Sequence, residues 1–276
     1  MARRREDSAA VRAVDLSIGT PHLRIVDGAT FTIDPGEILV VAGPAGAGKS
    51  TLASLVAGQP AAGVSIVGGD LTVGGIAGKR PGRLRREWLV RTGYLPQGAG
   101  ALLPAQFTVG EIIASPITSR SRKHNAAALR QRVASLLDEV HLPLGAADKY
   151  PYELSAGMLQ RVAFAHAMVL EPTLFVADDP MANLDIEMRP VVYEAIRRRQ
   201  REHNMASLIV TNDANLTREL QASAIALRAG HVVADGDFTA VPRPTPTGPI
   251  SAAFLAEPSE KPRTRRQRRE RRRQAT

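Results

Sequence analysis

Apolar and polar residues alternate along the first part of the chain. Between residues 11 and 33 apolar side chains tend to recur at every second position, with breaks at Gly19–Pro21 and at Asp27–Gly28. A period of two is typical of strands with one buried face, so this segment predicts short antiparallel strands. Residues 60 to 82, rich in Gly and Val, predict further strands and turns at a sheet edge.

Later segments show continuous apolar runs or a helical period. Buried strands are predicted where four or five apolar or small residues follow one another, at residues 38–42, 174–177 and 207–211. Residues 224–227 and 231–234, joined at Ala229–Gly230, predict a hairpin. Helices are expected over residues 51–57, 126–140, 156–170 and 188–201.

Length and composition limit the class of protein. A chain of 276 residues can form one large domain, or a domain with a subdomain. It contains no cysteine, which excludes disulfides, iron–sulfur clusters and a cysteine nucleophile. No apolar stretch approaches the roughly 18 residues of a membrane span, and the start lacks the apolar core of a signal peptide. We therefore expect a cytoplasmic protein.

Positive charge is concentrated at one end of the chain. Residues 261–276 hold one Lys, eight Arg and one Glu, and so carry +8 of the net charge of +9. The nearly neutral body does not favour a nucleic-acid groove, and no nucleic-acid partner is expected. Residues 1–10 are expected to be a disordered basic N-terminus and residues 241–276 a disordered Pro/Arg-rich tail. The tail is either solvated or attracted to anionic lipid headgroups.

Residues 43–50, GPAGAGKS, match the phosphate-binding pattern G-x-x-x-x-G-K-[ST] and lie between a predicted strand and a predicted helix. Glycines allow backbone N–H groups to face phosphate oxygens, and the helix N-terminus adds partial positive charge. Lys49 is expected to reach the β- and γ-phosphates, and Ser50 to ligate Mg²⁺. Asp178 follows the strand at residues 174–177, where phosphate-loop enzymes place a Mg²⁺-orienting carboxylate.

The segment YELSAGMLQRVAFAHAMVLEP (residues 152–172), followed by residues 174–185, resembles the signature, Walker B and D-loop block of ATP-binding cassette (ABC) transporter ATPases. Gln97 in GYLPQ resembles the Q-loop of that family, and residues 208–212 its switch region. The resemblance covers roughly residues 11–240, and TVGEII and KYPYELS are most similar to the oligopeptide, dipeptide and nickel importer branch. It implies an α/β P-loop NTPase core with an antiparallel β edge subdomain and an α-helical subdomain at about residues 100–170.

The same resemblance implies that two cassettes sandwich two ATP molecules, and it gives roles to individual residues. Asp179 would be the catalytic base, Gln97 would sense Mg²⁺ and the attacking water, and Asn212 occupies the switch position. Mg²⁺ would be held by Ser50, Gln97 and Asp178. The chain's own ATP would be bound by its loop, at Gly43, Pro44, Ala45, Gly46, Ala47, Gly48, Lys49, Ser50 and Thr51. Ser155 and Gly157 would touch the γ-phosphate of the ATP held by the other subunit, and Asp185 would cross the dimer interface.

Four positions or segments depart from the family pattern. The signature LSGGQ reads Leu154-Ser-Ala-Gly-Met158. Asp179 stands where the family has glutamate, and Asn212 where it has histidine. Residues 17–22 lack the aromatic residue that stacks on adenine; His22 is either a substitute ring or a solvated loop residue.

Two of these departures bear on the rate of hydrolysis. A general base must lie within roughly 2.6–3.2 Å of the proton it takes. Loss of one methylene withdraws the carboxylate by more than about 1 Å, and such a displacement can cost ~100-fold in rate. Asn212 can donate a hydrogen bond but carries no charge. We expect slow hydrolysis at this chain's own site, and therefore a heterodimer with a second, more active cassette; the alternative is that Asp179 acts through a shifted water.

The expected function is the ATP-binding and ATP-hydrolysing subunit of an ABC membrane transporter, importing peptides or similar small solutes from a peripheral position on the cytoplasmic side of the membrane. Its partners would be transmembrane permease subunits, a second ABC ATPase and, indirectly, a solute-binding protein. Phe107 either contacts the permease or packs in the core. Alternatives are a non-hydrolysing regulatory ABC subunit, or a soluble ABC ATPase acting on ribosomes or DNA; the latter usually has two cassettes in one chain or a long coiled-coil insertion.

Overall fold

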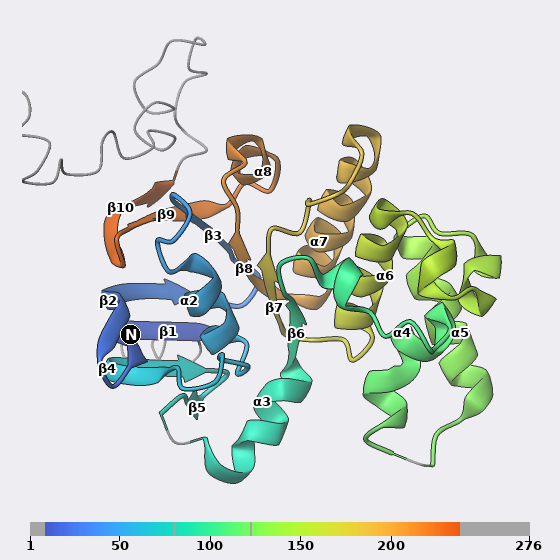
Figure 1. The fold of residues 1–276 in the computed structure, drawn as a ribbon, viewed down its shortest axis with the longest axis horizontal. Helices are drawn as coiled ribbons and strands as arrows, with labels where there is room; N and C mark the ends of the chain where they lie inside the picture. Colours follow the sequence, from blue (N-terminus) through green and yellow to red (C-terminus); the bar gives the residue numbers. More distant parts are fainter. Residues whose placement is uncertain (1–8, 80, 122, 238–276) are drawn as a thin grey trace, which may run out of the picture. The chain divides into compact units, whose positions relative to one another are not determined.

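A computed structural model describes residues 9–79, 81–121 and 123–237. These residues form two β-sheets with helices packed around them (Figure 1). Most of the expected basic N-terminus, and the whole Pro/Arg-rich tail, lie outside the described residues, so their disorder and the lipid contact of the tail stay predictions. Among the described helices, none has the length and apolar character required to cross a bilayer.

The larger sheet has six strands in the order β10-β9-β3-β8-β7-β6. Five neighbouring strands are parallel, and β10 pairs with β9 as the antiparallel arm of the predicted hairpin. The strands are β3 (Ile38–Ala42), β6 (Thr92–Leu95), β7 (Leu174–Asp178), β8 (Ala206–Val210), β9 (Ser223–Arg228) and β10 (His231–Asp237). Every residue of β7 and β8 is buried, as expected for parallel strands covered on both faces.

Successive residues of the central strands face two separate hydrophobic cores. Phe175 and Ala177 of β7 belong to the core formed with the helical part of the chain. Leu174 and Val176 belong to the core shared with the smaller sheet and with α2 (Lys49–Val56). Since side chains alternate across a strand, each apolar run contributes to both cores.

The smaller sheet is antiparallel, in the order β2-β1-β4-β5. Its strands are β1 (Val11–Thr20), β2 (Leu23–Ile33), β4 (Ser65–Val73) and β5 (Ile76–Ala77). The expected strand break at Asp27–Gly28 is wrong, because β2 continues through these residues with a register shift against β1. Ser17 stabilises the irregularity: its hydroxyl donates to Asp27 Oδ1 at 2.9 Å and accepts from the Gly28 N–H at 3.2 Å.

Helices cover the larger sheet and form a region without strands. Helices α4 (Val109–Thr118), α5 (Ala126–Glu139) and α6 (Ala156–Met168) pack on one another, and α7 (Arg189–His203) joins the same core. Helix α2 contacts strands of both sheets. Helices α3 (Arg85–Arg91) and α8 (Ala214–Glu219) complete the described α-helices. The α/β class predicted from the sequence is confirmed.

A buried ion pair connects α7 to α5. Arg199 donates from Nε to Glu139 Oε1 at 2.8 Å and from Nη2 to Oε2 at 2.5 Å. The two side chains are 7% and 6% exposed. Two parallel hydrogen bonds fix the guanidinium plane relative to the carboxylate, so the pair sets how the two helices approach each other.

We predict that Arg199→Ala lowers the free energy of unfolding by about 3 kcal/mol, because it leaves a buried carboxylate with only its contact to Arg198. Arg201→Ala is the matched control on the same helix. It removes an exposed pair with Glu194 (58% and 61% exposed) and should cost below about 1 kcal/mol. Chemical denaturation of the full chain measures both values, and equal losses would contradict the structural role of the buried pair.

Candidate functional site

The loop at residues 43–48 joins the carboxyl end of β3 to α2, whose first two residues, Lys49 and Ser50, complete the phosphate-binding pattern. Two of its glycines are dictated by close packing. A Cβ at Gly43 would lie 2.0 Å from the Leu227 carbonyl oxygen, and one at Gly48 would lie 2.9 Å from both Ile25 O and Val26 Cγ2. Gly48 also has φ +98°, a conformation in which only glycine is unstrained. The loop is therefore held tightly against both sheets.

Lys49 is the first residue of α2, and its ammonium group turns back over the loop. Nζ donates to the carbonyl oxygens of Gly43 at 2.7 Å and Pro44 at 2.9 Å. Burial lowers the pKa of Lys49, while the carboxylates of Asp178 and Asp179 act to raise it. A cation held between main-chain oxygens and two carboxylates is suited to receive an anionic ligand.

Two carboxylates lie at the carboxyl end of β7. Asp178 is the buried last residue of the strand. Asp179 follows it at φ +53°, and its N–H donates to Val210 O at the end of β8 at 2.8 Å. Burial raises the pKa of Asp179, Asp178 and Asp213 raise it further, and Arg189 and Lys49 act in the opposite direction. The hydrogen bond to β8 fixes the backbone from which the Asp179 carboxylate extends.

The segment after β8 connects this acidic side to the loop. Asn212 Oδ1 accepts from the Gly43 N–H at 3.2 Å. Asp213 accepts from the Asn215 N–H at 2.9 Å, which caps α8, and its other oxygen lies 3.2 Å from Arg189 Nη1. The residue at the predicted switch position, Asn212, is thus hydrogen-bonded to the first residue of the phosphate loop.

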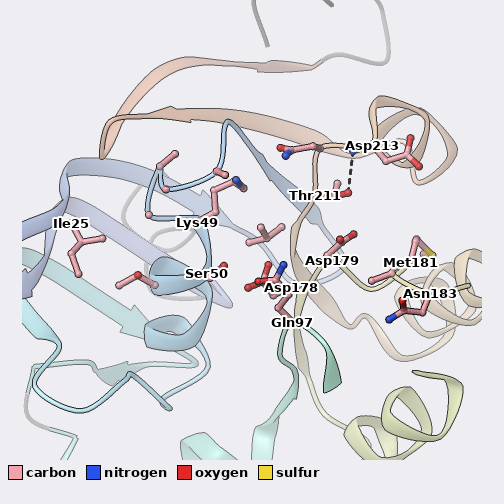
Figure 2. A pocket seen from close by; sticks show the side chains of 18 of the residues that line it. Ile25, Lys49, Ser50, Gln97, Asp178, Asp179, Met181, Asn183, Thr211 and Asp213 are labelled. Atoms are coloured by element: carbon pink, nitrogen blue, oxygen red, sulfur yellow. Dashed lines mark hydrogen bonds between the residues drawn. The ribbon is translucent and has the colours of Figure 1, made fainter. Parts of the chain in front are cut away.

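These elements surround a cavity of about 800 Å³. Figure 2 shows Ser50, Asp178 and Gln97 converging in it, with Lys49 and Asp179 nearby. The lining contains most residues that the sequence predicted for the chain's own site: Ala45, Gly46, Ala47, Gly48, Lys49, Ser50, Thr51, Gln97, Asp178, Asp179 and Asn212. Gly43 and Pro44 take part through their carbonyl bonds to Lys49.

The three residues predicted to act on the other subunit's ATP lie outside that lining. Ser155 is the N-cap of α6, and its hydroxyl accepts from the Met158 N–H at 3.2 Å. Gly157 packs closely on the D-loop, since a Cβ there would lie 3.1 Å from Asn183 O. Ser155 and Asp185 are both exposed, so their side chains are accessible to a second molecule.

Sequence reasoning missed eight lining residues: Ile25, Met181, Ala182, Asn183, Arg189, Val210, Thr211 and Asp213. Met181, Ala182, Asn183, Val210 and Thr211 lie inside the recognised segments 174–185 and 208–212 but had been given no role, and Asp213 directly follows the second segment. Ile25 could not have been found, because an apolar residue in a strand carries no signal for a ligand. His22 is exposed and does not line the cavity, whereas Ile25 does.

The chemistry of the lining fits a magnesium–triphosphate complex. Mg²⁺ prefers oxygen ligands, usually one or two from the protein together with phosphate oxygens. Ser50 offers a hydroxyl, Asp178 a carboxylate and Gln97 an amide oxygen in one cavity. A Cβ built at Gly46 meets nothing within 4 Å, so the loop backbone is open at this point. Backbone amides and Lys49 would then face the phosphates.

Comparisons with known proteins agree with this geometry. Residues 26–182 match the model of the ABC transporter family. The oligopeptide transport ATP-binding protein OppF of Escherichia coli is 30% identical over 237 residues, which cover 85% of this chain and 69% of that protein. The nickel import ATP-binding protein NikE of Rhodospirillum rubrum is 32% identical over 245 residues, which cover 87% of this chain and 85% of that protein. The ATP-binding cassette MJ0796, solved as a dimer in a post-hydrolysis state with ADP and Pi, has the same fold, with a TM-score of 0.75 and 22% sequence identity. The match covers 82% of this chain and 98% of that chain.

We predict that Gly48→Ala weakens binding of Mg²⁺–ATP by more than about 10-fold, because the added methyl displaces the loop from β2. Gly63→Ala is the control: its φ is also positive, at +78°, but its methyl meets nothing within 4 Å and lies away from the cavity. It should leave the affinity unchanged. Titration calorimetry on both variants measures this, and equal affinities would contradict the tight packing of the loop.

Proposed function

Because the chain belongs to the ABC transporter ATPase family, we propose that it is the ATP-binding and ATP-hydrolysing subunit of a membrane importer. The observation that carries the proposal is a single cavity in which a glycine loop and Lys49 face Asp178 and Asp179. That arrangement supplies main-chain donors and a cation for phosphates, together with the carboxylates that metal binding and water activation require.

Within this cavity we assign roles residue by residue. Lys49 and the amides of residues 45–51 bind and orient the phosphates. Ser50, Gln97 and Asp178 would hold Mg²⁺, which when bound neutralises charge on the phosphate oxygens. Asp179 takes the proton of the attacking water, and Gln97 positions that water. Asn212 donates a hydrogen bond to the γ-phosphate from its amide nitrogen, because its amide oxygen already accepts from the Gly43 N–H.

The ATP site of one subunit would be completed by another. Ser155, Gly157 and Asp185 are assigned to the nucleotide held by the partner ATPase, and this assignment is supported by their position outside the chain's own cavity. The exposed Ser155 hydroxyl and the free N-terminal amides of α6 form a surface that a phosphate could approach. Hydrolysis would then require the two subunits to close on each other.

The geometry of Asp179 supports the proposal that hydrolysis at this chain's own site is slow. Its N–H is bonded to Val210 O, so the backbone is not free to advance and replace the missing methylene. Asn212, the second substitution, adds no charge to the same site. A homodimer would contain two such sites. We therefore propose pairing with a second ABC ATPase whose own base and switch residues are standard.

The cargo is inferred from relatives. OppF and NikE are named for oligopeptide transport and nickel import. We propose import of peptides or similar small solutes delivered by a solute-binding protein, with this subunit peripheral on the cytoplasmic side of the membrane. The rival function, a regulatory subunit that binds ATP without cleaving it, uses the same cavity and differs only in turnover.

A second cavity, of about 860 Å³, supports a permease partner. It lies between α4, α5 and the segment before α4, and its wall is largely apolar, including Phe107, Ile112, Leu129, Val133 and Leu144. Phe107 is 47% exposed, so the alternative that it packs in the core is wrong. We propose that a short cytoplasmic helix of the transmembrane permease inserts here, with an apolar side chain against Phe107.

We predict that Asp179→Glu combined with Asn212→His raises the ATPase rate of the full chain by ~10- to 100-fold, because it restores both the reach of the base and the charge at the switch. Asp70→Glu, a remote exposed substitution on β4, should change nothing. The measurement is steady-state phosphate release, alone and with the partner ATPase. An unchanged rate in the double variant would count against an impaired site and favour the shifted-water alternative.

We also predict that Phe107→Asp reduces co-purification of the transmembrane subunits at least ~10-fold, because it places a charge in the apolar groove. Val233→Asp changes another exposed apolar residue, on β10 and outside the groove, and is the matched control. Tagged chains expressed in the native host, with permease subunits quantified by mass spectrometry, provide the measurement. Equal recovery with both variants would remove the groove as the docking site.

A further inference from the structure

Arg189 stands on the wall of the nucleotide cavity, and no motif predicted it. It is the first residue of α7 and lines the same cavity as Lys49, Asp178 and Asn212. Its Nη1 lies 3.2 Å from Asp213 Oδ2, in the segment that follows the switch position. The cavity therefore contains a guanidinium group contributed by α7, whereas Lys49 is contributed by α2.

One donor of this guanidinium has no partner. Arg189 Nε is buried and makes no hydrogen bond with any residue that the structure describes. Buried donors in native proteins are nearly always paired, and the Arg189 side chain as a whole is 37% exposed, so its other donors are available to an acceptor that enters the cavity. Asp213 does not provide an acceptor for Nε, because its hydrogen bond to Arg189 is made with Nη1 and not with Nε.

The cations of the cavity favour a phosphate as that acceptor. Its lining includes three carboxylates, Asp178, Asp179 and Asp213, and two cations, Lys49 and Arg189. Two of the three donors of Lys49 bond to the loop carbonyls, and the position after β8 offers the uncharged Asn212. A terminal phosphate gathers negative charge as it is transferred, and a guanidinium can donate two hydrogen bonds to it in one plane.

On the basis of the proposed function, we propose that Arg189 donates hydrogen bonds to the terminal phosphate of the ATP bound in this chain's own cavity. It supplies the positive charge that Asn212 does not carry. The ion pair with Asp213 then serves to hold the guanidinium at the wall until the nucleotide enters.

The test is the preference of the full chain for a triphosphate over a diphosphate. Affinities for Mg²⁺ with adenylyl imidodiphosphate and for Mg²⁺–ADP are measured by titration calorimetry. Arg189→Ala should weaken binding of the triphosphate analogue ~10- to 100-fold, which corresponds to the loss of one or two hydrogen bonds from a charged donor. The affinity for Mg²⁺–ADP should change by less than about 2-fold. Arg189→Lys should recover part of the loss, because it keeps the charge but not the planar fork.

Two further variants separate a phosphate contact from a structural role. Arg201→Ala, an exposed arginine on the same helix, should leave both affinities unchanged. Asp213→Asn retains the oxygen that caps α8 while removing the charge that pairs with Arg189. It should keep the triphosphate preference within about 3-fold if the ion pair only holds the guanidinium in place. Thermal melting of each variant confirms that it is folded.

Specific results would overturn the inference. If Arg189→Ala weakens the binding of both nucleotides equally, or of neither, the guanidinium does not contact the terminal phosphate. Asp213→Asn that reproduces the full loss would show that the ion pair itself is what matters. A wild-type chain that binds neither nucleotide would overturn the proposed function, and this inference with it.

Discussion

The parallel pairing of β3, β8 and β7 is the constraint on which the rest of the structure depends. Because the carboxyl ends of parallel strands meet at one edge of a sheet, the loop after β3, the carboxylates after β7 and the segment after β8 come together. Two hydrogen bonds from backbone N–H groups secure this edge: Gly43 donates to Oδ1 of the Asn212 side chain, and Asp179 donates to Val210 O. The phosphate cradle and the acidic wall are thus positioned by the sheet itself.

The same edge places opposite charges close together in a partly buried cavity. Lys49 is desolvated, and three carboxylates surround the space in front of it. Such a site is poorly balanced for a polyphosphate alone, because the carboxylates repel it. We infer that a divalent cation at Ser50 and Asp178, together with Arg189, offsets this repulsion. Binding and hydrolysis make different demands here: in our proposal the glycine loop and Lys49 supply what binding needs, whereas the proposed base, Asp179, is one methylene shorter than glutamate and its N–H is bonded to Val210 O.

The sequence predicted the parts of this site that have fixed spacing. GPAGAGKS and the strand ending at Asp178 could be placed because their residue types are dictated by phosphate and metal chemistry. Helix α4 was missed because it is short and contains Pro116, and β6 because it has only four residues. The bulge at Asp27–Gly28 was mistaken for a strand break, since turn residues serve both. Ile25 and Arg189 have ordinary identities for a strand and a helix start, and only tertiary packing brings them to the cavity.

The central claim is that this chain binds Mg²⁺–ATP in its own cradle but cleaves it slowly. Single-turnover cleavage of limiting γ-labelled ATP by excess full-length chain tests it most directly, because bound and cleaved nucleotide are then counted separately. The account predicts that ATP is bound and recovered largely intact over many minutes, and that cleavage accelerates when a second cassette with a standard base is added. Rapid cleavage by the chain alone, or no bound nucleotide under either condition, would contradict it.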